Sequence, residues 1–198
     1  MQLTGLRCSV TGPKTLFAED FTAAISDSSF AAVGFKNIAE VGGKYFTAKK
    51  TSANLYLEIS AFAARQNVVI SWLILPPINL DHSANEILHF DTKDGFDNGA
   101  ILQAMVSTNY DGGNNPAKAK WTLLPAAMAK GSTSGFAPQW VFSNNLDLSK
   151  FKGNVYIAFR YEGNDPSAAI GKLTTSFRLD NITAVSYTHL RAHETPEH

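Results

Sequence analysis

Alternation of apolar and polar residues with a period of two is the feature that most constrains the fold of this chain. Segment 55–60 places Leu55, Leu57 and Ile59 on one side, and segment 155–162 repeats the pattern. Such alternation is typical of a β-strand with one buried face. The sequence therefore predicts strands that cover an apolar interior with one side only.

Further segments extend this β pattern. Segments 68–75 and 101–107 are apolar on both sides and end at turn residues, as expected for strands in the middle of a two-layer sandwich. Leu88, Phe90 and Thr92 mark another half-buried strand. Clusters of Gly, Pro, Asp and Asn separate these segments. We count about ten strands at spacings of roughly 8–15 residues, which predicts an all-β sandwich or barrel.

Helical patterns are scarce. No window longer than about ten residues keeps apolar positions at helical spacing without a Gly or Pro. A short helix is expected, if anywhere, only in segments 18–26 and 126–130. Because parallel strands need long crossover connections, usually helices, the strands should be mostly antiparallel.

Composition excludes several classes of protein. The 198 residues contain 17 Lys and Arg against 17 Asp and Glu, so no nucleic-acid partner is predicted. No apolar run of about 18 residues occurs, so no membrane insertion is expected, and the first twenty residues or so lack the pattern of a signal peptide. The single Cys8 excludes a disulfide framework.

We predict three regions. Segment 11–14, which contains Gly12 and Pro13, marks a junction, so residues 1–15 are expected to be a leader or a linker from a preceding region. One sandwich domain should cover 16–184. Residues 185–198 form a tail that departs from the strand pattern.

The tail invites a metal interpretation. Three of the five His residues lie there, and His189 and His193 stand four apart, the spacing that places two imidazoles on one helical face for zinc. However, residues 185–198 resemble the translation of a sequencing adapter. We therefore expect a non-native tail and exclude it from the reasoning about fold and metal sites.

A series of motifs runs along almost the whole predicted domain. They occupy 16–21, 71–76 with 78–80, 88–91, 106–110 with Trp121, 146–153, 154–161 and 177–182. In this order they resemble the choice-of-anchor J and cleaved-adhesin type of bacterial surface domain. The resemblance implies a jelly-roll-like β-sandwich. The chain departs from the family's pattern in carrying Asn181 where many relatives have a second Asp, and in showing no anchor.

The resemblance also implies a function. It points to a non-catalytic adhesion or carbohydrate-binding module of a larger secreted or surface protein, located outside the cell or at its surface. Its partners would be a glycan or a surface protein, together with neighbouring domains of the same chain. Two alternatives stay open: a structural spacer without its own ligand, and a glycoside hydrolase.

Calcium is the cofactor that the resemblance implies, because jelly-roll sandwiches often join their first and last strands through a cation held by oxygen ligands. The candidate ligands are Glu19, Asp20, Asp180 and Asn181. Alternatively, these side chains face solvent or accept backbone N–H groups. Segment 91–98 also collects oxygen ligands, but its spacing is not that of an EF-hand, and turn chemistry explains it.

Carbohydrate binding requires exposed aromatic faces beside polar groups. Four aromatic residues lie near turn residues and are candidates for this role: Tyr45, Phe96, Tyr110 and Trp140. Trp72 and Trp121 lie within or beside apolar runs and are expected in the core instead.

Catalysis is not predicted. A glycosidase needs two carboxylates about 5–10 Å apart, and although Glu58 and Glu162 point to the polar sides of their strands, no pair shares one strand face. There is no Gly-x-Ser-x-Gly motif, and outside the tail only His82 and His89 are available as a base.

Arg160 is a charged residue flanked by apolar positions in the middle of a predicted strand. A half-buried guanidinium needs a carboxylate or several carbonyl groups. We expect a structural ion pair with Asp91 or Asp180 on a neighbouring strand.

Overall fold

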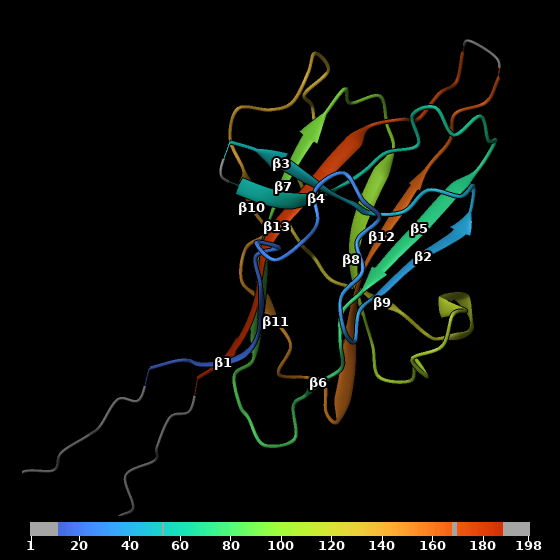
Figure 1. Cartoon of the computed structure of the whole chain (residues 1–198). Helices are drawn as coiled ribbons and strands as arrows, with labels where there is room; N and C mark the ends of the chain where they lie inside the picture. Colours follow the sequence, from blue (N-terminus) through green and yellow to red (C-terminus); the bar gives the residue numbers. More distant parts are fainter. Residues whose placement is uncertain (1–11, 53, 168–169, 188–198) are drawn as a thin grey trace, which may run out of the picture.

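Two antiparallel sheets face each other in the computed structural model, which describes residues 12–52, 54–167 and 170–187 (Figure 1). The first sheet contains β1 (Lys14–Glu19), β3 (Thr47–Thr51), β4 (Asn54–Ile59), β7 (Ile87–Gly95), β10 (Val141–Phe142), β11 (Leu146–Asp147) and β13 (Ser176–Ser186). The second contains β2 (Lys36–Val41), β5 (Val69–Ile74), β6 (Ile78–Asn79), β8 (Ile101–Ser107), β9 (Thr122–Leu123) and β12 (Asn154–Gly163). The predicted all-β sandwich is confirmed.

The strand order follows from long-range pairing. The first sheet runs β10-β7-β13-β4-β3, with β1 beside β13 and β11 beside β7. The second runs β2-β5-β12-β8-β9, with β6 beside β12. All these pairs are antiparallel, as predicted. Four of the thirteen strands in the described residues have only two residues, too few for a period-2 pattern to reveal them.

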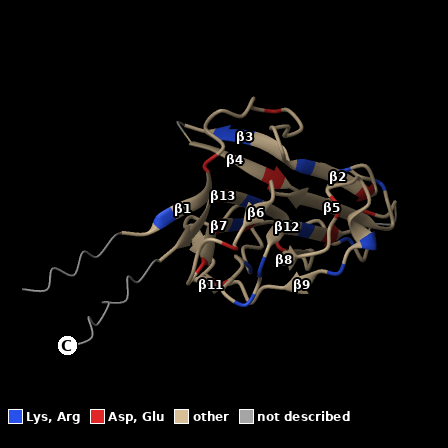
Figure 2. Cartoon of the chain, turned by 90° about the horizontal axis from the view of Figure 1, so that it is seen from below, with Lys and Arg blue, Asp and Glu red and all other residues tan. Residues whose placement is uncertain are grey.

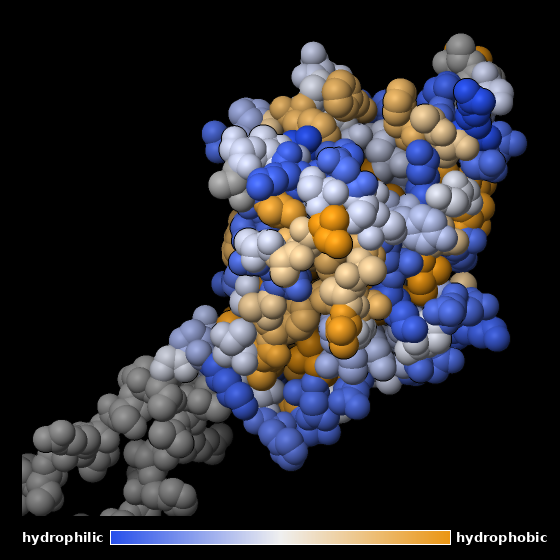
Figure 3. All heavy atoms as spheres, viewed as in Figure 1, coloured by the Kyte–Doolittle hydropathy of each residue, from blue (hydrophilic) through white to orange (hydrophobic). Residues whose placement is uncertain are grey.

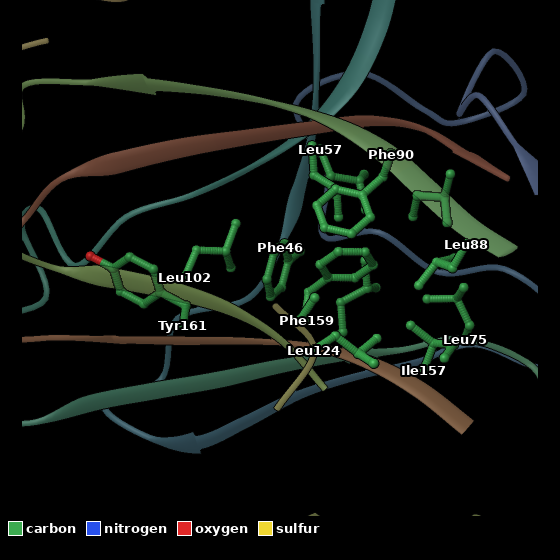
Figure 4. Close-up of a cluster of buried hydrophobic side chains, with 14 of the residues drawn as sticks. Phe46, Leu57, Leu75, Leu88, Phe90, Leu102, Leu124, Ile157, Phe159 and Tyr161 are labelled. Atoms are coloured by element: carbon green, nitrogen blue, oxygen red, sulfur yellow. The ribbon is translucent and has the colours of Figure 1, made fainter. Parts of the chain in front are cut away.

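The core lies between the sheets, where the alternating residues of opposite strands meet (Figure 4). Phe90 of β7 and Phe159 of β12 pack edge to face, with their ring centroids 4.8 Å apart. Leu57 and Leu88 lie beside them from the first sheet. Burying each such side chain contributes about 1.5–3 kcal/mol. Tyr161, also of β12, is fully buried, and its hydroxyl accepts the Ala61 N–H at 2.9 Å.

A second apolar cluster covers the outer face of the second sheet. Trp72 of β5 packs on Trp121 at 5.2 Å, and Tyr110 packs on Trp121 at 5.5 Å. The connection between β8 and β9, which includes the 3-10 helix Pro116–Lys118, carries these covering rings. This cover explains why segment 68–75 is apolar on both sides.

The connection between β1 and β2 crosses one open edge of the sandwich (Figure 1). Phe21 and Phe30 anchor it inside, with ring centroids 5.3 Å apart. Ile25 and Val33 of the same connection are exposed. Apolar residues gather in the middle of the face seen in Figure 3, with polar residues around them.

The helices expected in 18–26 and 126–130 are absent, so that prediction is wrong. Ala18 belongs to β1, and segment 126–130 runs irregularly along the first sheet, where Ala127 N–H bonds Ser143 O and Ala129 N–H bonds Thr92 Oγ1. Sheet neighbours thus satisfy the backbone groups that a helix would pair internally. The part of the chain described contains no helix suited to crossing a lipid bilayer.

The sandwich extends two residues past each predicted limit. Lys14 pairs with Ser186 and Thr15 with Val185, so β1 starts within the predicted leader and β13 ends within the predicted tail. The two ends of the described chain therefore leave the molecule side by side (Figure 1). Cys8, His189 and His193 lie outside the described residues, so the predictions about them stay predictions.

Candidate functional site

A cleft of about 630 Å³ lies at one end of the outer face of the first sheet. Its floor comes from strand residues whose neighbours in sequence face the core: Thr47 and Lys49 flank the buried Ala48, and Glu58 lies between Leu57 and Ile59. The alternation that builds the core therefore also builds the floor. The volume falls within the range of about 300–1,000 Å³ found for small-molecule sites.

Three exposed aromatic rings border this cleft, each on a different loop. Tyr45 precedes β3, Phe62 follows β4, and Phe96 follows β7; their exposed fractions are 46%, 71% and 53%. Tyr45 and Phe96 were predicted as ligand contacts. Phe62 was missed because it stands between Ala61 and Ala63 without a Gly, Pro or Asn nearby, so the sequence resembles a core segment.

The backbone of Phe96 has an unusual conformation. Its φ angle is 54°, a left-handed value that costs a bulky residue of order 1–3 kcal/mol. The loop holds it there: its N–H donates to Gly135 O at 3.1 Å, and its ring packs edge to face on Phe136 at 5.7 Å. A strained backbone thus presents a half-exposed ring at a fixed position in the cleft.

A hydrogen-bond network fixes the wall beside Phe96. Asp97 Oδ1 accepts from Thr175 Oγ1 at 2.9 Å, and Oδ2 accepts from Gly131 N–H at 2.7 Å. Asn98 Oδ1 accepts the Thr174 N–H at 2.6 Å. Burial acts to raise the pKa of Asp97, but the bonds from Gly131 and Thr175 outweigh it and lower that pKa below its ordinary value. These bonds agree with the turn interpretation of segment 91–98.

A ladder of cations and rings leads away from the cleft across the outer face of the first sheet. Arg178 Cζ lies 3.3 Å from the ring centroid of Phe136 and 4.6 Å from that of Tyr56. Tyr56 packs on Trp140 at 5.8 Å, and Lys93 Nζ lies 5.0 Å from the Trp140 ring centroid. Trp140 therefore packs in this ladder and does not line the cleft, and its role in ligand binding stays a prediction.

Tyr110 was predicted to be an exposed ligand contact, but it is buried. It is only 5% exposed, its ring packs on Trp121 and Tyr156, and its hydroxyl donates to Gly113 O. Burial raises its pKa to about 12, with the Asp111 charge as a smaller cause. Tyr110 is thus a packing residue of the second sheet. Trp72 is buried, as predicted, but in the cluster on the outer face of the second sheet, and Trp121 is partly buried against it.

Arg160 pairs with a residue of its own strand. Its Nη1 lies 2.6 Å from Glu162 Oε2, and its Cζ lies 5.5 Å from the ring centroid of Trp72. The predicted partners Asp91 and Asp180 belong to the first sheet, whereas Arg160 faces outward from the second. Alternation fixes which side of a strand a residue occupies, but not which sheet contains the strand.

The four predicted calcium ligands lie around the middle of β13, where β1 ends. Glu19, Asp20 and Asn181 line a hollow of about 330 Å³ where β1 meets β13. Asp180 is buried, and its Oδ1 and Oδ2 accept from Asn181 N–H and Asn54 Nδ2 at 2.8 and 2.9 Å. Burial raises the pKa of Asp180, and the nearby charges of Asp91 and Asp20 add to this effect.

Backbone and hydroxyl donors occupy these oxygens. Glu19 Oε1 accepts the Phe21 N–H at 2.7 Å, and Asp20 Oδ1 accepts the Thr22 hydroxyl at 2.7 Å. Over 12–52, 54–167 and 170–187, no three Asp, Glu, His or Cys side chains are arranged to hold a metal ion. The donor chemistry suits Ca²⁺, but the described residues form no ready cation cage. Calcium stays a prediction.

Comparison with solved structures supports the fold. The K2 cleaved adhesin domain of Lys-gingipain superposes with a TM-score of 0.58 at 17% identity, covering 85% of this chain and 96% of that domain. The K1 domain from Porphyromonas gingivalis W83 gives 0.53 at 15% identity, with 87% and 98% covered. No protein-family model and no curated protein matches the sequence. The chain has the β-sandwich fold of cleaved adhesin domains.

Proposed function

We propose that this chain is a non-catalytic carbohydrate-binding module that serves adhesion, and that the glycan binds in the cleft between Tyr45, Phe62 and Phe96. The observation that carries the proposal is Phe96. A bulky residue in a left-handed conformation lowers stability, and glycine or asparagine would occupy that position at less cost. A ring that is strained, braced and half-exposed in a cleft is typical of a ligand contact.

The chemistry around the rings suits a sugar. The apolar face of a pyranose can stack on an aromatic ring, while its hydroxyl groups need hydrogen-bond partners. Thr133 and Ser176 supply hydroxyl groups in the same cleft, and Glu58 supplies a carboxylate. Aromatic faces and polar groups therefore converge on one space.

The adhesin-type fold agrees with a role outside the cell. On that basis we propose a secreted or surface-exposed parent protein whose partner is a glycan, free or carried by a surface protein. The choice-of-anchor J assignment is part of the same proposal and rests on the sequence motifs alone.

Hydrolase activity explains this cleft less well than carbohydrate binding does. Glu58 and Asp97 are two carboxylates at this site, but the lowered pKa of Asp97 makes it a poor proton donor. Glu58 is held in an ion pair with Arg178 at 2.9 Å. His89 stacks on Phe142 on the outer face of β7, away from both carboxylates.

A role as a structural spacer without its own ligand also explains the structure less well than carbohydrate binding does. Because Lys14 pairs with Ser186, the ends of the described chain lie together, near the end of β13 opposite Ser176 and the cleft. A domain joined in this way adds little distance between its neighbours. It would instead hold the cleft away from the point of attachment.

Affinity electrophoresis on a panel of polysaccharides tests the proposal. We expect at least one glycan to retard the native protein, and Phe96→Asn to weaken that binding about tenfold or more. Because asparagine tolerates the left-handed region, the free energy of unfolding should change by no more than about 1 kcal/mol. Phe142→Ala, which removes a half-exposed ring outside the cleft, is the matched control and should bind normally. A folded protein that no glycan retards would overturn the proposal.

A further inference from the structure

The charged side chains that border the cleft are already engaged within the chain. Lys49 Nζ lies 2.7 Å from Asp27 Oδ1, and Lys44 Nζ donates to Phe62 O at 2.6 Å. Glu58 Oε2 accepts from Arg178 Nε at 2.9 Å, and the two flanking rings of the ladder hold that guanidinium. Both lysines that line the cleft thus have an acceptor in this protein.

The acidic groups at the site would repel an anionic ligand. Asp97 stays ionised because Gly131 N–H, Thr175 Oγ1 and Gly99 N–H all donate to it, the last at 3.2 Å. Glu58 adds a second carboxylate on the floor. A sugar carboxylate or sulfate would face these two groups, and it would have to share Lys44 or Lys49 with the acceptor that each lysine already has.

A neutral sugar meets neither obstacle. Stacking on Tyr45, Phe62 and Phe96 requires no charge, and the Thr133 and Ser176 hydroxyl groups can donate or accept. Rejection of a competing ligand often comes from unpaired or like charges placed against it. Figure 2 shows Lys and Arg interspersed with Asp and Glu along the strands and loops of the described chain.

We propose that the cleft selects uncharged carbohydrate and discriminates against uronic acid and sulfated sugars. This inference rests on the proposed carbohydrate-binding function and adds the class of ligand to it. It also implies that binding is almost independent of ionic strength, since no ion pair forms between protein and ligand.

The test uses pairs of polysaccharides that share one backbone, with one neutral and one charged member in each pair. Hydroxyethyl cellulose is compared with carboxymethyl cellulose, and methyl-esterified polygalacturonate with its de-esterified form. We expect any retardation to be at least about tenfold stronger for the neutral member, and equal at about 0.05 and 0.5 M NaCl. Stronger binding of the charged member, weakening with salt, would overturn the inference while leaving carbohydrate binding intact.

A gain-of-binding variant completes the test. Thr133 is exposed at the cleft, so Thr133→Lys adds a cation there. It should strengthen binding of the charged member in a salt-dependent way. No gain would show that charge does not decide the selectivity. If no polysaccharide of either kind binds the folded native protein, the proposed function itself fails, and that outcome is distinct from the two above.

Discussion

The outer faces of the two sheets differ in what covers them. On the second sheet, the connection between β8 and β9 folds back and buries Tyr110 against Trp121. On the first sheet no such segment of the described residues lies over the cleft, and Phe96 stays half-exposed. Tyr110 and Phe96 both sit beside glycine-rich turns in the sequence. The comparison teaches that the exposure of an aromatic residue depends on a distant covering segment, which local sequence does not encode.

The largest expected effect concerns the covered face. Trp72→Ala should lower the free energy of unfolding by about 3–5 kcal/mol, because the side chain is buried and packs on Trp121. Urea unfolding measures this change. Carbohydrate binding by the folded fraction should be unaffected. A loss below about 1 kcal/mol would show that the cover is loose and that the two faces are less different than described.

The aromatic ladder of the first sheet should give an intermediate effect. Trp140→Ala removes contacts with Tyr56 and Lys93, so we expect a loss of about 1–3 kcal/mol in stability and little change in glycan affinity. Thermal unfolding measures the stability of this variant, and affinity electrophoresis measures its glycan affinity. Lost affinity with unchanged stability would place Trp140 in the binding site, as the sequence first predicted.

The open face should show the reverse pattern. Tyr45→Ala is expected to weaken glycan binding about tenfold, which is about 1.4 kcal/mol, and to change stability by less than about 0.5 kcal/mol. Tyr45 is exposed in the loop before β3, so its removal leaves no cavity. Isothermal titration with the best-binding polysaccharide measures the affinity. Unchanged affinity would remove Tyr45 from the proposed site.

The smallest effect concerns Asp180. Because its folded-state pKa is raised above the ordinary value, the folded protein binds this proton more tightly than the unfolded chain does. Its contribution to stability therefore falls as pH rises from about 4. Asp180→Asn removes this titration, so its melting temperature relative to native protein should improve between about pH 4 and 7. A constant difference would contradict the pKa shift.

Asp147 supplies a control of opposite sign. Hydrogen bonds from the hydroxyl and N–H of Ser149 lower its pKa, so the melting temperature of Asp147→Asn should fall relative to that of native protein as pH rises.

Melting temperatures also test the calcium prediction. If Ca²⁺ binds at Glu19, Asp20, Asp180 and Asn181, it should raise the melting temperature of native protein, and chelation should lower it. Indifference to both additions would contradict the calcium prediction.

Much of the fold was predictable from the sequence because alternation acts locally. The pattern at 155–162 placed Val155, Ile157, Phe159 and Tyr161 in the core, and the structure confirms it. The two-residue strands could not be predicted from the sequence, because they are defined by their pairing with β7, β8 or β12 and not by a pattern of their own. The absent helix at 126–130 has the same cause, since neighbouring strands supply its hydrogen bonds.

The site was predictable only in part. Turn residues indicated the loops of Tyr45 and Phe96, but which loops share one end of a sheet depends on strand order. Phe62 carries no local mark of exposure. Tyr110 and Trp140 carry the same local marks as Phe96, yet other segments pack on them. Gathering of Glu19, Asp20 and Asn181 at one hollow was expected from joining the first and last strands, and β1 does pair with β13.

The phenol of Tyr161 has a consequence for how the cleft keeps its width. Its hydroxyl accepts from Ala61, next to Phe62, and donates to Thr175 O at 3.1 Å, next to the Asn98 network. The Tyr161 hydroxyl, which belongs to the second sheet, thus holds the two segments that border the cleft on the outer face of the first sheet. Substitutions of buried residues such as Tyr161 can therefore change the affinity for carbohydrate, although these residues do not contact the bound sugar.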